Sequence, residues 1–406
     1  MKKAVSLSLL ALVTLSADTQ LDMVKEQLAK QENITMKLQK EVGLLTQKQK
    51  QSTHTSASFS QNAYLPDIAL ILNMSAVSRD VKNSTYEKFA IPGFIQSGEA
   101  HLPFNKNRGF NLNYAEVAMH SVVDPYFEAF ANFHLHPDEF EIGEAYIQTT
   151  SLPYALRLKT GKFKSSFGRI NSKHQHSWHF DDQPIIYKAM FGPDSISDAG
   201  VQVQWIAPTD RYLMFGLEAM QGTNGRSFGD VDSNNLYIGY LKTSVDIGED
   251  ISILGGVSLA QGTNTTGNDT KVYGMDLTLR KQLGSYSALI LQNEFLQRDK
   301  DLGVKTDTQS GFYSEMVYQY NNNYSTGIRY DNITKNDTDL STYNGIDASD
   351  LQKYTAMVEY KPFPMSRLRL SYSHDKTKVI GSERRDVDKL MLSINIAAGA
   401  HGAHDY

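Results

Sequence analysis

Apolar and polar residues alternate at every second position in many segments of the chain after Leu65. The segment from Asp388 to Ile396 shows this most clearly, because one of its faces carries only Leu390, Leu392, Ile394 and Ile396. A period of two residues predicts a strand that is apolar on one side and polar on the other. Comparable segments recur as far as Ile396, with turn residues between them, so about 16 strands are predicted.

The connections between these segments are of two kinds. Short turns, such as the one at Ala207-Pro208, alternate with longer loops that are rich in Asn, Asp and Gly. Together with an apolar face on each strand, this asymmetry is typical of bacterial outer-membrane barrels, whose apolar residues face lipid while polar residues face a lumen. We therefore predict an all-β protein in which residues 65–406 form a transmembrane antiparallel β-barrel. A soluble β-sandwich is the alternative, but it does not need an apolar outer face on every strand.

The amino-terminal residues differ from the rest of the chain. Lys2 and Lys3 precede an apolar run from Ala4 to Leu15 and then small residues, which predicts a secretory signal peptide over residues 1–17. Residues 18–51 carry apolar side chains at alternating spacings of three and four, so a short periplasmic coiled-coil helix is predicted there. A single solvated helix is the alternative for this segment. Residues 52–64 are rich in Ser and Thr and predict a linker.

Composition restricts the chemistry that the chain can carry. The sequence has no cysteine, which excludes disulfides and thiolate metal sites. Its formal net charge of −5 argues against a nucleic-acid-binding protein. No spacing typical of a catalytic constellation and no phosphate-binding glycine motif is found, so we predict that the protein is not an enzyme and name no catalytic residues.

The longest interval without a clean strand runs from Phe167 to Asp198. Structureless intervals longer than about 12–15 residues are uncommon in compact proteins and usually carry function. Its cations, imidazoles, carboxylates and aromatic side chains suit a wet interior, so we expect it to fold into the lumen and set the narrowest point of a pore. Trp178 and Phe180 would then pack against the barrel wall. Its histidines would make conductance depend on pH between about pH 5 and 8.

Charged residues on the polar faces of the strands and in this interval would line the lumen. Rings of such charges tune the selectivity of pores. The sequence leaves open which sign of charge dominates at the narrowest point, and the same charges could merely solvate the lumen. The candidate pore and constriction residues are Glu128, Arg157, Lys159, Arg169, Lys173, Arg280, Arg329, Arg367 and Arg369.

Histidines and carboxylates gather in three places: on one strand, in the long interval, and at the carboxyl terminus. Imidazole with carboxylate and no thiol suits a borderline divalent ion such as zinc or nickel, although neutral histidine is also an ordinary lumen residue. No other cofactor is expected. The candidate metal ligands are His134, His136, His174, His176, His179, Asp181, Asp182, His401 and His404.

One block of sequence resembles a known family. Residues Arg157 to Asn171, with Gly161-Lys162-Phe163 followed by Phe167-Gly168, resemble a block of the phosphate-selective porins of the O/P type, and the layout of signal, coiled coil and barrel is similar. The residues from Ala398 to Tyr406, with the His-rich interval, are similar to related barrels labelled zinc-regulated outer-membrane receptors.

This resemblance implies a trimeric, porin-like channel in the outer membrane of a Gram-negative bacterium, through which small solutes or ions diffuse. A zinc- or other divalent-metal-binding uptake protein of the outer membrane is the first alternative. A structural barrel that the coiled coil tethers to the periplasm is the second alternative.

Overall fold

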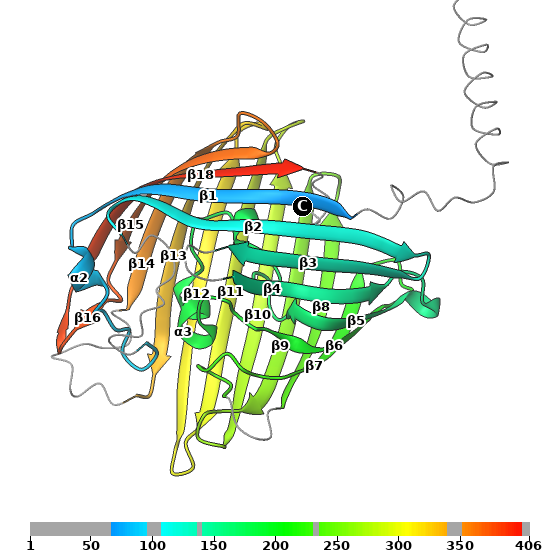
Figure 1. Ribbon diagram of the computed structural model, residues 1–406, viewed down its shortest axis with the longest axis horizontal. Coiled ribbons are helices and arrows are strands. Elements are labelled where there is room, and N and C mark those ends of the chain that lie inside the picture. The colour runs from blue at the N-terminus through cyan, green and yellow to red at the C-terminus, as the bar shows by residue number, and fades with distance from the viewer. Residues whose placement is uncertain (1–65, 96–106, 136–139, 230–234, 339–350, 400–406) are drawn as a thin grey trace, which may run out of the picture. The chain divides into compact units, whose positions relative to one another are not determined.

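The computed structural model describes residues 66–95, 107–135, 140–229, 235–338 and 351–399. These residues form a closed antiparallel barrel of 16 strands, which confirms the predicted fold class (Figure 1). The barrel strands are β1 (Asp67–Arg79), β2 (Gly109–Asp124), β3 (Phe127–Leu135), β4 (Phe140–Thr149), β5 (Leu156–Lys164), β6 (Ser197–Ile206), β7 (Leu213–Met220), β8 (Leu236–Ile247), β9 (Ile251–Thr263), β10 (Asp269–Gln282), β11 (Ala288–Asp301), β12 (Thr306–Gln319), β13 (Tyr324–Asn336), β14 (Gln352–Tyr360), β15 (Ser366–Asp375) and β18 (Val387–Gly399).

Each barrel strand pairs with its neighbours in chain order, and the first strand closes the sheet against the last. Asn73 of β1 lies opposite Asn395 of β18, and Ala76 lies opposite Leu392. Closure leaves no strand edge with unpaired backbone groups, and each such group would cost several kcal/mol in lipid. The shorter elements are α2 (Asn83–Tyr86), α3 (Ile185–Phe191), the 3₁₀ turns η2 (Pro153–Ala155) and η3 (Gln175–Ser177), and a hairpin of β16 (Val379–Ile380) and β17 (Glu383–Arg384).

The alternation of the sequence separates the outer face of the barrel from its lumen, as predicted. On β18, Leu390, Leu392 and Ile396 are 40–48% exposed on the outside, whereas Met391 and Ser393 are 2% and 4% exposed. Strands β6, β10, β14 and β15 repeat the pattern. An apolar exterior therefore surrounds a polar interior.

The two ends of the barrel differ. At one end, the connections 125–126, 150–155, 207–212, 248–250, 283–287, 320–323 and 361–365 are all tight. At the other end, segments 80–108, 165–196, 221–235, 337–351 and 376–386 are longer, whereas the connections 264–268 and 302–305 are also tight. Segment 80–108 packs against segment 376–386, because Ala90 pairs with Val379 and Ile380 contacts the apolar cluster of Val81, Phe89 and Val387. This asymmetry is the one that the sequence predicts.

The contacts divide the chain into two units, Met1–Tyr64 and Leu65–Tyr406. The predicted signal peptide, coiled-coil helix and linker all lie outside the described residues. Among the residues that are described, no helix has the length and apolar character needed to cross a membrane.

Candidate functional site

The connection between β5 and β6, residues 165–196, enters the barrel; we call it the lumenal loop. In the order of the strands, β13 and β14 lie on the wall opposite β5 and β6. Helix α3 of the loop packs against β12 and β13 (Figure 1). Loop residues also bond to Glu218 on β7, Ser258 on β9 and Ser393 on β18. The lumenal loop therefore crosses the lumen from wall to wall.

Apolar side chains hold the middle of the lumenal loop. Phe167 and Phe191 meet edge to face with their ring centroids 5.5 Å apart, and both are buried. Phe180 is 1% exposed and packs against Val317 and Met357 of the wall. Trp178 is also buried within the interior apolar cluster. The expected inward packing of Trp178 and Phe180 is thus confirmed.

A buried ionic anchor joins the lumenal loop to the opposite wall. Arg329 of β13 donates from Nη2 to Asp182 Oδ1 over 2.8 Å, and Lys353 of β14 binds the other oxygen of Asp182. Arg329 also pairs with Asp331, 2.9 Å away. Burial by itself would raise the pKa of Asp182, but Lys353 and Arg329 hold it well below its usual value. We call Asp182, Arg329 and Lys353 the ionic anchor.

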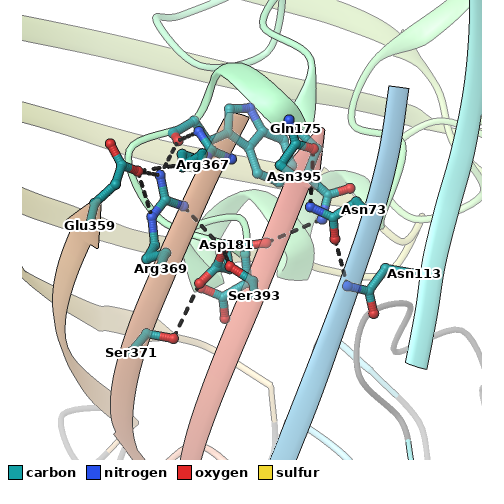
Figure 2. Close-up of polar contacts among 12 residues, drawn as sticks. Asn73, Asn113, Gln175, Asp181, Glu359, Arg367, Arg369, Ser371, Ser393 and Asn395 are labelled. Carbon is teal, nitrogen blue, oxygen red and sulfur yellow. Dashed lines mark hydrogen bonds and ion pairs between the residues drawn. The ribbon is translucent and has the colours of Figure 1, made fainter. Parts of the chain in front are cut away.

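A second polar anchor lies at the seam where the barrel closes (Figure 2). Asp181 accepts hydrogen bonds from Ser393 Oγ at 2.6 Å and Ser371 Oγ at 3.2 Å, and it pairs with Arg369 at 3.2 Å. Figure 2 shows Arg369 between Asp181 and Glu359 of β14, which it also binds. Arg367 donates to the carbonyl oxygen of Trp178 over 3.3 Å. These contacts use both oxygens of Asp181.

Carboxylates of β7 and β11 accept hydrogen bonds from backbone amides and a hydroxyl group of the lumenal loop. Glu294 of β11 accepts from the Arg169 amide at 2.9 Å and from the Tyr187 hydroxyl at 2.5 Å. Glu218 of β7 accepts from the Ser166 amide at 2.9 Å. These carboxylates accept hydrogen bonds from neutral donors, and Glu294 also attracts Lys173 of the loop electrostatically.

A cluster of histidines and carboxylates lies where the lumenal loop meets β2, β3 and β4. Glu116 stands 3.8 Å from His134 Nε2 and 3.8 Å from His174 Nδ1, and 3.6 Å from His176 Nδ1. His174 Nε2 is 2.5 Å from Glu144 Oε2. Burial lowers the pKa of His176, which favours the neutral imidazole that binds metal.

The predicted metal ligands thus fall into separate groups. His134, His174 and His176 come together, whereas His179 bonds to Glu315 of β12, 2.7 Å away. Asp181 and Asp182 bind the wall as described above. His136, His401 and His404 lie outside the described residues.

The predicted pore cations also separate into two sets. Arg329, Arg367 and Arg369 all pair with carboxylates. Within the described part of the chain, ion pairs are absent for Arg157, Lys159, Arg169, Lys173, Arg280 and also Lys242 of β8.

Arg169 and Lys173 are neighbours among these cations that form no ion pair. Burial lowers the pKa of Lys173, and the nearby Arg169 lowers it further. The Arg169 Nε is buried without a hydrogen-bond acceptor. Lys242 Nζ donates to the Gly168 carbonyl oxygen at 2.8 Å. Glu128, the predicted pore carboxylate, instead binds His120 and Gln148 nearer to the end with tight turns.

Sequence reasoning missed both Glu116 and Glu144 as partners of the histidines. The pairing of β1 with β2 shifts by one residue near Asn73, and that of β3 with β4 shifts at Asn132. Such bulges break the two-residue alternation beside these two carboxylates. Glu144 is adjacent to Gly143, a signal of a bulge in a strand that could have been used.

Comparison with known proteins identifies a relative by sequence and solved structures with a similar fold. No family model matches the chain. An uncharacterized protein of Aquifex aeolicus strain VF5 is 37% identical over 384 residues, an alignment that covers 86% of this chain and 81% of that protein. The chain belongs to the family of this Aquifex aeolicus protein.

Several solved structures that are similar to this Aquifex-family barrel are outer-membrane channels. The anion-selective porin from Comamonas acidovorans has a TM-score of 0.54 at 10% identity, and the match covers 82% of this chain and 99% of the porin. The channel DcaP of Acinetobacter baumannii has a TM-score of 0.53 at 10% identity, covering 82% and 97%. OmpF of Salmonella typhi, in complex with daunomycin, has a TM-score of 0.52 at 10% identity, covering 84% and 99%. At these identities the similarity establishes the porin-like fold alone.

Proposed function

We propose that this Aquifex-family barrel is a passive outer-membrane channel whose aperture is set by the lumenal loop. The observation that carries the proposal is a closed barrel with an apolar exterior that holds a loop bonded to opposite walls. Polar side chains remain along the interior beside that loop, as a path for hydrated solutes requires. Protein reconstituted in a planar bilayer should therefore show single-channel conductance.

Deleting residues 172–184 should increase single-channel conductance, because this segment carries both Asp181 and Asp182 and much of the mass inside the lumen. The measurement is conductance in planar bilayers at fixed salt. A matched control is deletion of Gly303 and Val304 at the same end, since Val304 is 94% exposed and outside the lumen. Unchanged conductance after the first deletion would show that the lumenal loop does not set the aperture.

The lumen is best suited to anions. Arg157, Lys159, Arg169, Lys173 and Lys242 form no ion pair within the described residues, although carboxylates such as Glu294 and Asp276 attract Lys173 at longer range. Each free cation attracts an anion about 4 Å away by about 1 kcal/mol in water. We infer a preference for small anions, and the resemblance to phosphate-selective porins of the O/P type stays a prediction about the solute.

Replacing Arg169 and Lys173 together with Glu should shift the reversal potential in a salt gradient towards cations. Two reversed charges should change the chloride-to-potassium permeability ratio at least about fivefold, since about 1.4 kcal/mol corresponds to a factor of ten. The matched control is Lys271→Glu, because Lys271 points outward from β10 and its charge does not face the lumen. An equal shift in both variants would contradict the anion proposal.

A metal-binding uptake protein is the second candidate. The specific observation in its favour is that His134 and His174 converge on Glu116. The absence of cysteine suits either a passive channel or the capture of a hydrated ion. Zinc-dependent uptake into cells that express the protein, lost in a His134→Ala variant, would favour this candidate over a plain channel.

The proposal includes a cellular location and an oligomeric state. We place the barrel in the outer membrane of a Gram-negative bacterium, with the predicted coiled-coil helix in the periplasm, and expect a homotrimer. One similar solved structure, OmpT of Vibrio cholerae, is described as a trimer form. The heptad segment 18–51 lies outside the described residues, so its role in assembly stays a prediction.

A further inference from the structure

Three ligand-capable side chains converge at the junction between the lumenal loop and the wall. They are Glu116 of β2, His134 of β3 and His174 of the loop, and their donor atoms all lie within 4.8 Å of one another. Glu116 and His174 are 2% and 3% exposed. Residues far apart in the sequence thus bring nitrogen and oxygen donors close together.

The separations of the three histidines from Glu116 are close to the distance between two ligands of one metal ion. His134 Nε2 and His174 Nδ1 each stand 3.8 Å from a Glu116 oxygen, and His176 Nδ1 stands 3.6 Å away. A hydrogen bond between nitrogen and oxygen spans about 2.7–3.2 Å. Two ligands bound at about 2.0–2.1 Å to a tetrahedral zinc ion are about 3.3–3.4 Å apart. The distances from Glu116 exceed this value by a few tenths of an ångström, and the donor atoms of Glu116, His134 and His174 lie within 4.8 Å of one another. Binding an ion would therefore draw the ligands closer together and displace the Asn132 amide.

The surroundings of His174 support the same interpretation. Its Nε2 is 2.5 Å from Glu144 Oε2, while its Nδ1 faces Glu116. Metal-binding histidines usually donate their second ring N–H to a carboxylate, which fixes the orientation of the ring. Asn132 Nδ2 lies 3.1 Å from Glu116 Oε1 and 3.2 Å from His174 Nδ1. This amide donor therefore lies between the same two acceptors, at the position a cation would take over.

We propose that Glu116, His134 and His174, with His176 as the fourth ligand, bind a divalent transition-metal ion, zinc foremost, and that the ion clamps the lumenal loop to the β2–β3 wall. Imidazole and carboxylate ligands without thiolate suit zinc, cobalt and nickel. Metal binding itself does not depend on the proposed channel function, whereas the effect of the clamp on the aperture rests on it.

Binding is tested on the full-length barrel, folded in detergent, without a histidine tag and freed of metal by a chelator. Zinc affinity is measured by competition with a chromophoric chelator, and cobalt binding by the intense visible absorption of a tetrahedral site. His134→Ala and His174→Ala should each abolish the cobalt spectrum. Glu144→Gln, which keeps the shape of the side chain beside His174, should weaken zinc binding about 10–100-fold.

The matched controls are His120→Ala and His179→Ala, because these lumenal histidines pair with Glu128 and Glu315 outside the cluster. Both should retain wild-type affinity and the cobalt spectrum. Retained folding of every variant is checked by the heat-dependent gel mobility of the barrel, and Glu144→Gln serves as the informative variant if a ligand substitution prevents folding. Wild-type affinity in His134→Ala and Glu144→Gln, or no tetrahedral cobalt spectrum in the wild type, would overturn the site.

The clamp is tested separately by conductance. Zinc should reduce the open-channel noise or the conductance of the wild type, and His134→Ala should not respond. A barrel that binds zinc through the cluster without any change in conductance would overturn the clamp but leave the metal site standing. A barrel that conducts but binds no zinc would overturn the inference and leave the proposed channel intact.

Discussion

Replacing Asp182 with Asn is expected to release the lumenal loop from the β13–β14 wall and raise single-channel conductance. Asp182 binds both Arg329 and Lys353, which are 2% and 5% exposed. Removing one partner of a buried ion pair costs about 3–5 kcal/mol, because a charge stays buried without compensation. Arg329 keeps Asp331 as a partner, so Lys353 is the buried cation that loses its ion-pair partner and carries this cost. The measurements are conductance in planar bilayers and the rate of proteolysis within residues 165–196.

The control for this variant is Asp337→Asn. Asp337 pairs with Lys335 at the same end of the barrel, but both side chains are largely exposed, and exposed pairs contribute at most about 1 kcal/mol. Conductance and proteolysis should then stay at wild-type values. If Asp182→Asn behaved like this control, the ionic anchor would not hold the loop.

The ionic anchor should also withstand acid. Lys353 and Arg329 hold the pKa of Asp182 well below its usual value, although burial opposes them. A carboxylate with a lowered pKa contributes stability above its unfolded-state pKa and loses it only as the pH falls through the folded-state pKa. The loop should therefore remain docked at about pH 4, where a free Asp is already about half protonated.

Placing Arg at Leu392 is expected to destabilise the barrel in a membrane by about 2–4 kcal/mol if the position lies near the midplane. Leu392 is 40% exposed on the outer face of β18, between Ala76 of β1 and Leu370 of β15. An arginine there would have to leave water for hydrocarbon. The free energy of unfolding is measured by urea titration of the protein in lipid vesicles.

The matched control is Asn395→Arg on the same strand. Asn395 faces the lumen, where its Oδ1 accepts a hydrogen bond from Asn73 at 3.3 Å (Figure 2), so the change should cost only about 1 kcal/mol. Ser393 is unsuitable as a control because it donates to Asp181 of the lumenal loop. Equal losses at Leu392 and Asn395 would mean that the outer face of β18 does not contact lipid.

The amino-acid pattern was sufficient for the barrel and for the position of its lumenal loop. Each strand with a two-residue alternation must place its apolar side chains on one face, and closure makes that face the exterior. The interval from Phe167 to Asp198 corresponds to the gap between β5, which ends at Lys164, and β6, which begins at Ser197. Trp178 and Phe180 pack inward for the reason expected, since apolar surface is removed from water there.

Only the tertiary structure decided which charges meet. Arg157 and Arg369 occupy equivalent positions in their alternating segments, yet Arg369 binds Glu359 and Asp181 while Arg157 pairs with no carboxylate in the described residues. Asp182 and Lys353 are separated by 171 residues in the sequence, and Asp181 and Ser393 by 212. Such pairs depend on strand register around a closed barrel and on the path of a loop across it. Neither leaves a local periodic signal, so the ionic anchor and the convergence of His134 and His174 on Glu116 could not be predicted from the chain alone.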